Sequence, residues 1–230
     1  VSFRTGRGIV SDRHKLAMTV ASAYALWAET DLLIGIGTRL EVPAGRWSQA
    51  TTGKTIARID IDPVEMRRFA PDIAIVADAA QAQAAAALTA ALGAGAPAAG
   101  RAEAIARAKA ATALAIQKVQ PQLSYLEAIR DVLPDDGILC DEMTQVGYAS
   151  WFGFPVYQPR GLVTSGFSGT LGAGFPTALG VKVAHPDRVV VSVTGDGGFL
   201  FGGTELATAM QHGINLITVL FNNSAYGNVL

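Results

Sequence analysis

The sequence contains little cysteine, little histidine and little charge. Of its 230 residues, one is cysteine, three are histidine and 16% are charged, and the formal net charge is −1. A single cysteine cannot form a disulfide within the chain, which favours a reducing compartment. A near-neutral chain without a basic cluster is not typical of proteins that bind nucleic acid or a membrane surface, and no apolar run is long enough to span a membrane. We therefore expect a cytoplasmic protein that binds neither nucleic acid nor membrane.

Half of the residues are hydrophobic, which is enough to build a core in one or two domains. Strands are predicted at residues 32–36, 55–61, 73–77, 137–141, 189–193 and 216–221, and helices at residues 15–27, 63–69, 78–92, 101–119, 124–132, 177–184 and 203–212. This alternation predicts an α/β fold with two Rossmann-like parallel-sheet domains and helices on both faces. Breaker residues at positions 93–100 set the boundaries: a first domain at residues 1–92, a linker and bridging helix at 93–120, and a second domain at 121–230.

The most informative segment begins where an apolar strand runs into Gly195, Asp196, Gly197 and Gly198. A second apolar strand then ends on Asn222 and Asn223, and 223 − 196 gives a separation of 27 positions. That distance fits one helix and one parallel strand, so both polar groups should reach the same carboxyl edge of a sheet, where α/β proteins bind ligands. Carboxylate, amide and backbone oxygens suit Mg²⁺ or Ca²⁺, and glycines let the backbone approach an anion. The alternative is an ordinary turn with a helix-capping Asp and an Asn-Asn turn.

This segment resembles the thiamine diphosphate signature of the superfamily that includes acetohydroxyacid synthase, benzoylformate decarboxylase and pyruvate oxidase. In that signature Gly-Asp-Gly is followed, about a strand–helix–strand later, by Asn-Asn. The resemblance implies that Asp196, Asn223 and the backbone oxygen of Ala225 hold the Mg²⁺ that clamps the diphosphate. It also implies that the turn from Gly195 to Gly198 contacts the cofactor.

A second match lies at residues 168–176, which resemble the family segment whose bulky apolar residue supports the bent cofactor between its two rings. Leu171 takes that position, 25 residues before Asp196 (196 − 171), and the backbone oxygen of Gly169 would accept a hydrogen bond from the 4′-amino group. The resemblance further suggests that Thr144 and Gln145 reach the terminal phosphate. The alternatives are a core leucine in a glycine-rich loop and a surface turn that leads into a helix.

Two acidic residues near these motifs receive no catalytic role from the sequence. Glu142 lies in the turn that follows the strand predicted at residues 137–141, and Glu205 is expected in the first turn of the helix after Gly-Asp-Gly. An acidic side chain near a helix N-terminus is explained by the helix dipole alone.

The first half of the chain resembles the central domain of the same superfamily in residues 33–39 and 59–63. Gly35 and Gly37 after a strand, with Asp60 and Asp62 about twenty-five residues later, also resemble a dinucleotide fingerprint. The match is weak, because Leu40 stands where the third glycine is expected. Some family members bind FAD in this domain and others bind ADP. The sequence leaves FAD, ADP and an empty domain open.

The resemblance implies Mg²⁺- and thiamine-diphosphate-dependent decarboxylation of a 2-oxo acid with carboligation, as in the acetolactate synthases of branched-chain amino acid biosynthesis. Similarity in residues 59–63 and 205–208 favours this reading. Simple decarboxylation by a benzoylformate or oxalyl-CoA decarboxylase-like lyase, glyoxylate carboligation and a non-catalytic nucleotide-binding module remain alternatives. Family active sites form between subunits, so we expect a homodimer or homotetramer.

The resemblance covers only part of a family member. Full members contain a pyrimidine-binding, a central and a diphosphate-binding domain, and the glutamate that protonates the pyrimidine ring belongs to the first of these. We therefore expect this chain to be a fragment that has no turnover by itself.

Overall fold

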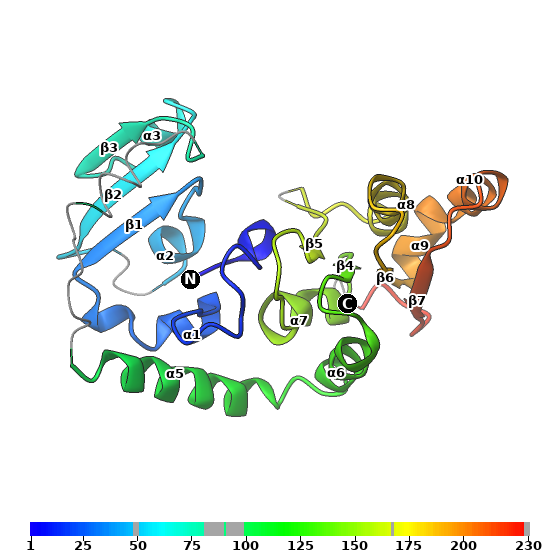
Figure 1. Ribbon diagram of the computed structural model, residues 1–230, viewed down its shortest axis with the longest axis horizontal. Coiled ribbons are helices and arrows are strands. Elements are labelled where there is room, and N and C mark those ends of the chain that lie inside the picture. Colours follow the sequence, from blue (N-terminus) through cyan, green and yellow to red (C-terminus); the bar gives the residue numbers. More distant parts are fainter. Residues whose placement is uncertain (48–50, 81–89, 91–98, 167, 228–230) are drawn as a thin grey trace. The chain divides into compact units, whose positions relative to one another are not determined.

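Figure 1 shows the computed structural model of the chain, in which residues 1–47, 51–80, 90, 99–166 and 168–227 are described. Contacts divide the chain into two compact units. The first unit is Tyr24–Arg101, and the second combines Val1–Ala23 with Ala102–Leu230. The boundaries expected from the sequence place residues 1–23 in the first domain, whereas the contacts of these residues lie in the second unit.

The first unit is built on a parallel three-stranded sheet in the order β1-β2-β3. Its elements are η2 (Trp27–Glu29), β1 (Leu32–Ile36), α2 (Glu41–Gly45), β2 (Thr55–Asp60), α3 (Glu65–Arg68) and β3 (Ile73–Val76). The three predicted strands are confirmed to within one residue at their ends. The helix predicted at residues 78–92 and the linker at 93–100 lie mostly outside the described residues.

Arg58, in the middle of β2, is fully buried and ties the loops at one end of this sheet together. Its guanidinium group donates to the carbonyl oxygens of Glu65 at 2.7 Å, Phe69 at 3.2 Å and Thr38 at 3.0 Å. These acceptors lower the cost of burying the cation, although the Arg58 Nε has no hydrogen-bond partner among the described residues. The first unit is therefore held together by a polar anchor as well as by Ile56 and Ile59.

The second unit contains a four-stranded parallel sheet in the order β5-β4-β6-β7. Its strands are β4 (Ile138–Cys140), β5 (Leu162–Val163), β6 (Val190–Gly195) and β7 (Ile217–Phe221). Its helical elements are η1 (Arg4–Gly6), α1 (Val20–Tyr24), α5 (Arg101–Ile116), α6 (Gln122–Val132), α7 (Gln145–Gly153), α8 (Gly174–Ala184), α9 (Asp196–Gly202), η3 (Gly203–Glu205) and α10 (Leu206–Gln211). All predicted strands of this half are present, and β5 is added to them.

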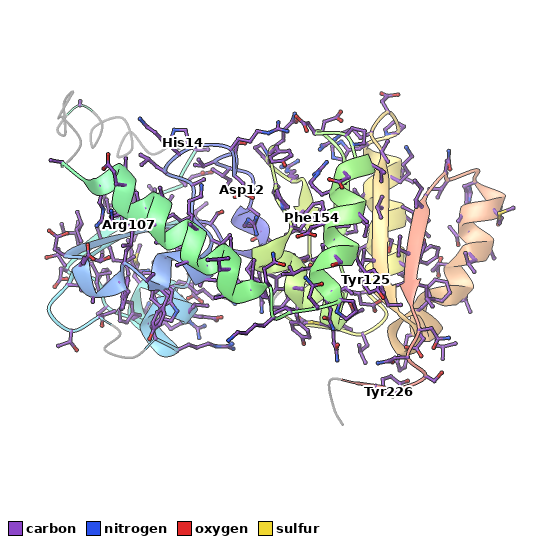
Figure 2. The ribbon with its side chains drawn as sticks, turned by 90° about the horizontal axis from the view of Figure 1, so that it is seen from below. Asp12, His14, Arg107, Tyr125, Phe154 and Tyr226 are labelled. Atoms are coloured by element: carbon purple, nitrogen blue, oxygen red, sulfur yellow. The ribbon has the colours of Figure 1, made fainter. Side chains whose placement is uncertain are left out.

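Helices cover both faces of this sheet, as the sequence predicts. Successive strand residues point to opposite faces: Leu139 of β4 belongs to a buried cluster with residues of α6 and α7, whereas its neighbours Ile138 and Cys140 pack with Ala178 of α8. Tyr125 of α6, labelled in Figure 2, packs against Phe221 of β7 with ring centroids 5.0 Å apart and ring planes tilted by 45°. The predicted α/β class with parallel sheets is confirmed.

Several helix boundaries differ from the prediction. A helix begins directly at Asp196, whereas the sequence predicts the first helix after this turn at residues 203–212. The tripeptide 203–205 is a 3-10 turn, and Glu205 is the N-cap residue of α10. The helix predicted at residues 15–27 is shortened to α1, which is followed by η2.

Cys140 is the cysteine of this chain, and it is a core residue of the second unit. It is buried between β4 and α8, and burial raises the pKa of its thiol to about 12, which leaves it unreactive. Among the described residues, no helix combines the length and the apolar character needed to cross a membrane.

Candidate functional site

The candidate site lies where β4, β6 and β7 end, which we call the second-unit edge. β6 and β7 are parallel neighbours, and Gly195 is paired with Phe221 at their last aligned position. Asp196 therefore follows β6 beside Asn222 and Asn223, which follow β7. The prediction that these polar residues arrive at one edge of one sheet is confirmed.

The loop after β7 folds back onto the turn that contains Asp196. The Ala225 backbone N–H donates to Asn223 Oδ1 at 3.2 Å, which shapes a tight turn. Tyr226, labelled in Figure 2, places its ring over Gly197, where an added Cβ would lie 2.6 Å from Tyr226 Cε1. The contact places the residue after Ala225 against the turn that contains Asp196 and explains why Gly197 carries no side chain.

These residues offer oxygen atoms for a hard cation. Asp196 supplies a carboxylate, Asn223 an amide oxygen and Ala225 a backbone carbonyl, the ligand types that Mg²⁺ prefers. The structure describes no group of three or more His, Cys, Asp or Glu that could hold a metal. The proposed ligands contain a single residue of those types, so they form a site with one charged ligand.

The loop that carries Leu171 reaches the same edge. Leu171 is 39% exposed, which differs from the buried leucine of the alternative interpretation. Gly172 has φ +83°, a conformation that favours glycine, and a Cβ at this position would lie 2.5 Å from Phe201 Cβ on α9. A Cβ on Gly202 would lie 2.8 Å from the carbonyl oxygen of Gly172. The loop therefore packs directly against the helix that Asp196 starts. Gly169, at φ +59°, precedes this contact.

Thr144 and Gln145 follow β4 at the second-unit edge, but their side chains have partners within the protein. Thr144 Oγ1 accepts a hydrogen bond from the Gly147 N–H at 2.9 Å and so caps α7. Its methyl carbon would lie 3.2 Å from a Cβ on Gly195. Gln145 is exposed, and its Oε1 accepts a hydrogen bond from Gln122 Nε2 at 2.6 Å. A phosphate contact by either residue stays a prediction.

Glu142 is the residue of this edge that sequence reasoning missed. Its side chain is 1% exposed, and its two carboxylate oxygens accept hydrogen bonds from the Gly172 N–H and the Thr194 hydroxyl. The turn after β4, the Leu171 loop and the end of β6 thus meet at one buried carboxylate. The only sequence signal is an acidic residue directly after a buried apolar strand, which also occurs in solvated turns.

Asp141, the neighbour of Glu142, is a buried acid with a different set of partners. It is 2% exposed, and its Oδ2 accepts hydrogen bonds from Ser150 Oγ at 2.7 Å and from Trp151 Nε1 at 2.9 Å. Burial raises the pKa of the Asp141 carboxyl to about 7, although these hydrogen bonds act in the opposite direction. Asp141 therefore titrates near neutral pH and holds α7 against β4.

We expect the buried charge of Asp141 to make stability fall as pH rises. A carboxyl whose pKa is about 7 when folded, and about 3.9 when unfolded, favours the folded state at low pH, and this contribution is lost as pH rises through 7. Asp141→Asn keeps an oxygen acceptor and removes the charge. The unfolding free energy of both proteins is measured with urea from pH 5 to pH 8. Over this range the wild type should lose on the order of 2 to 3 kcal/mol more than Asp141→Asn does. Parallel pH curves for the two proteins would contradict the titration of Asp141.

The first unit has its own polar edge, where the sequence raises a nucleotide hypothesis. Gly37, Asp60 and Asp78 line a shallow cavity of about 360 Å³ at the carboxyl ends of its strands. Packing explains why a glycine stands at position 35, because a Cβ on Gly35 would lie 2.9 Å from Leu40 Cδ1. Asp78 Oδ1 accepts from the Ala80 N–H at 2.8 Å. The geometry is that of an open carboxylate-lined edge, and the choice among FAD, ADP and no ligand stays open.

Comparison with known proteins identifies the relatives of both units. Residues 143–230 match the family description "Thiamine pyrophosphate enzyme, C-terminal TPP binding domain", and residues 1–88 match "Thiamine pyrophosphate enzyme, central domain". The chain is 30% identical to a probable acetolactate synthase large subunit of Methanococcus aeolicus over 97% of its length, and 31% identical to the acetolactate synthase isozyme 1 large subunit of Escherichia coli (strain K12) over 91%. It is also 33% identical to a probable 2-ketoarginine decarboxylase of Pseudomonas aeruginosa over 93% of its length.

The chain spans about two fifths of the length of these relatives: 42% of the Methanococcus protein and 38% of each of the other two. The matched regions include Asp196, Asn223 and Leu171 in the one family segment and the Gly35–Asp60 region in the other.

Proposed function

Because this chain belongs to the thiamine pyrophosphate enzyme family, we propose that the intact protein uses thiamine diphosphate and Mg²⁺ to decarboxylate a 2-oxo acid. We propose further that it joins the product to a second carbonyl compound, as an acetolactate synthase does. The observation that carries the proposal is the meeting of the Asp196 turn, the Asn223–Ala225 turn and the Leu171 loop at one sheet edge. In an ordinary βαβ turn, nothing would require the loop that carries the exposed Leu171 to pack against α9, the short helix that begins at Asp196.

The residues of this edge have separate tasks in the proposed reaction. Asp196, Asn223 and Ala225 would hold Mg²⁺ through oxygen atoms, and the glycines from Gly195 to Gly198 would let the backbone approach the diphosphate. Leu171 would support the cofactor from an exposed position without adding a competing hydrogen bond. When bound, thiamine diphosphate supplies the carbon nucleophile and the electron sink that decarboxylation needs. The protein supplies orientation and exclusion of water.

Decarboxylation without carboligation is the second candidate function. The relative from Pseudomonas aeruginosa is described as a decarboxylase and is 33% identical to this chain, slightly more than the two acetolactate synthases above. The two functions share the cofactor and the first bond cleavage and differ in what the product meets next. The residues of the second-unit edge serve both.

Three related properties complete the proposal. We propose a cytoplasmic homodimer or homotetramer, and size-exclusion chromatography with light scattering would test the oligomeric state.

The open edge of the first unit, with Gly37 and Asp60, is the proposed place of FAD or ADP if either binds. A flavin absorption band that co-purifies with the protein would identify FAD, and its absence would leave ADP or no nucleotide. A role in branched-chain amino acid biosynthesis depends on the carboligation.

The experiment that tests the function offers several 2-oxo acids to the intact protein with thiamine diphosphate, Mg²⁺ and, separately, FAD. Pyruvate, 2-oxobutyrate, benzoylformate, glyoxylate, oxalyl-CoA and 2-ketoarginine are compared, and CO₂ and products are measured by mass spectrometry. An acetohydroxy acid from pyruvate is the expected result. An aldehyde or a formyl product would favour the decarboxylase, and the absence of CO₂ from all substrates would favour a non-catalytic nucleotide-binding module.

A further inference from the structure

Glu142 occupies a buried position that no task described above explains. Glu142 is 1% exposed, and each of its carboxylate oxygens accepts a hydrogen bond from an uncharged donor. Burial of a carboxylate costs free energy unless such donors are present. A turn after β4 does not by itself require a buried acid, so the burial of Glu142 needs another explanation.

The two donors come from segments that are distant in sequence and adjacent in the proposed site. One is the N–H of Gly172, the residue directly after Leu171, and the other is the hydroxyl of Thr194, two residues before Asp196. One carboxylate therefore connects the loop of the apolar support to the strand of the metal ligand.

Glycines allow Glu142 to come close to both neighbouring helices. A Cβ on Gly174, the first residue of α8, would lie 2.7 Å from Glu142 Cβ. A Cβ on Gly198, in the first turn of α9, would lie 2.6 Å from Glu142 Oε1. Both distances are too short for a real side chain. Glycines on both α8 and α9 thus leave room for the Glu142 carboxylate, and ordinary core packing does not require a glycine at either place.

We propose that Glu142 is a positioning residue that fixes the Leu171 loop relative to Asp196. The inference rests on the proposed function, because the distance between these two residues matters only if one supports the cofactor and the other holds its metal. Glu142 acts through Gly172 and Thr194 and need not touch the cofactor. Small misplacements of a supporting group reduce rates strongly, so a rigid connection between the two segments favours the reaction.

Two substitutions at this position separate the hydrogen bonds from the shape of the side chain. Glu142→Leu keeps a similar volume and removes both acceptors. Glu142→Gln can keep both hydrogen bonds, because its amide oxygen can accept from the Gly172 N–H and its amide N–H can donate to the Thr194 hydroxyl, which is able to accept. Asp141→Asn is the matched control: it changes the adjacent buried acid, whose side-chain donors Ser150 and Trp151 lie on α7.

The test measures hydrogen–deuterium exchange of residues 169–174 in the intact protein without cofactor. Glu142→Leu should speed exchange of this segment by about tenfold or more, because the Gly172 N–H loses its acceptor. Glu142→Gln and Asp141→Asn should stay close to the wild type. Equal exchange in Glu142→Leu and the wild type would overturn the proposal. If Glu142→Leu does not fold, Thr194→Val replaces it as the test, with a smaller expected increase and the same overturning result.

A second readout links the connection to the cofactor. The rate of deuterium exchange at the thiazolium C2 of bound thiamine diphosphate should fall about tenfold or more in Glu142→Leu, with a smaller change in cofactor affinity, and Glu142→Gln should restore it. An unchanged C2 exchange rate would show that Glu142 serves the fold alone. A wild-type protein that binds no thiamine diphosphate would contradict the proposed function instead, whatever the exchange of residues 169–174.

Discussion

Asp196→Ala is expected to abolish Mg²⁺-dependent binding of thiamine diphosphate to the intact protein. Asp196 is the only charged group among the proposed ligands, and the amide of Asn223 and the carbonyl of Ala225 are neutral. Without the carboxylate, the Mg²⁺ and the diphosphate lose the charge balance that holds them together. The apparent affinity should fall by more than about 100-fold, since even residues that only support a metal ligand cost about 10- to 100-fold. Isothermal titration at fixed Mg²⁺ measures this change.

Asp187→Ala is the matched control for this experiment. Asp187 is an exposed carboxylate just before β6, at the opposite end of the strand that leads to Asp196. Its removal changes the net charge equally and should leave cofactor binding unchanged. Asp196→Ala should also remain folded, because an acid in the first turn of a helix contributes only about 0.3 to 1 kcal/mol through the helix dipole. Unchanged affinity in Asp196→Ala would mean that the metal is held elsewhere.

The sheets and the polar residues at their edges could be predicted from the sequence, because both follow from local patterns. Apolar runs with β-branched residues identified β1, β6 and β7, and the residues at their carboxyl ends could be placed without knowing any distant contact. Parallel pairing then brings Asp196 and Asn223 to the same edge. The prediction therefore needed only the order of strands along the chain and the direction of each strand.

Helix α9 could not be predicted, because its local sequence opposes a helix. Three of its seven residues, Gly197, Gly198 and Gly202, are glycine, and each costs about 1 kcal/mol relative to alanine in a helix interior. The structure explains each one by a neighbour: Tyr226, Glu142 and the Gly172 carbonyl occupy the space that a Cβ would need. The low helix propensity is the consequence of three long-range contacts, and a local pattern contains no information about them.

The burial of Glu142 was hidden for the same reason. In the sequence it follows Asp141 in a polar turn, and two adjacent acids after a strand indicate solvent exposure. Its partners Gly172 and Thr194 are 30 and 52 residues away. Thr144 illustrates the converse case, because its role as the cap of α7 is local and follows from its place before a helix.

Leu171→Ala is expected to slow deuterium exchange at the thiazolium C2 of the bound cofactor by about 100-fold, the usual order for a misplacement of about 1 Å. The leucine is proposed to support the cofactor between its rings, and alanine is too short to do so. The affinity for thiamine diphosphate should change much less, because the Mg²⁺ and diphosphate contacts at Asp196 remain. NMR of the bound cofactor during exchange in deuterated buffer measures the rate, and Leu171→Met, which keeps an apolar side chain of similar volume, should retain most of it.

The exposure of Leu171 makes this prediction separable from an effect on folding. At 39% exposure, Leu171 contributes less to the core than a buried leucine, so its truncation should cost well below the 2 to 5 kcal/mol of a typical buried Leu→Ala change. Leu114→Ala removes the same atoms from a leucine of α5 that is 76% exposed, and both the stability and the C2 exchange rate should stay at the wild-type level. If Leu171→Ala loses stability like a core substitution while C2 exchange is unchanged, the leucine packs the glycine-rich loop and supports no cofactor. Loss of exchange with the fold intact would instead assign the residue to the cofactor, because a surface leucine that neither stabilises the protein nor touches a ligand has no means to change that rate.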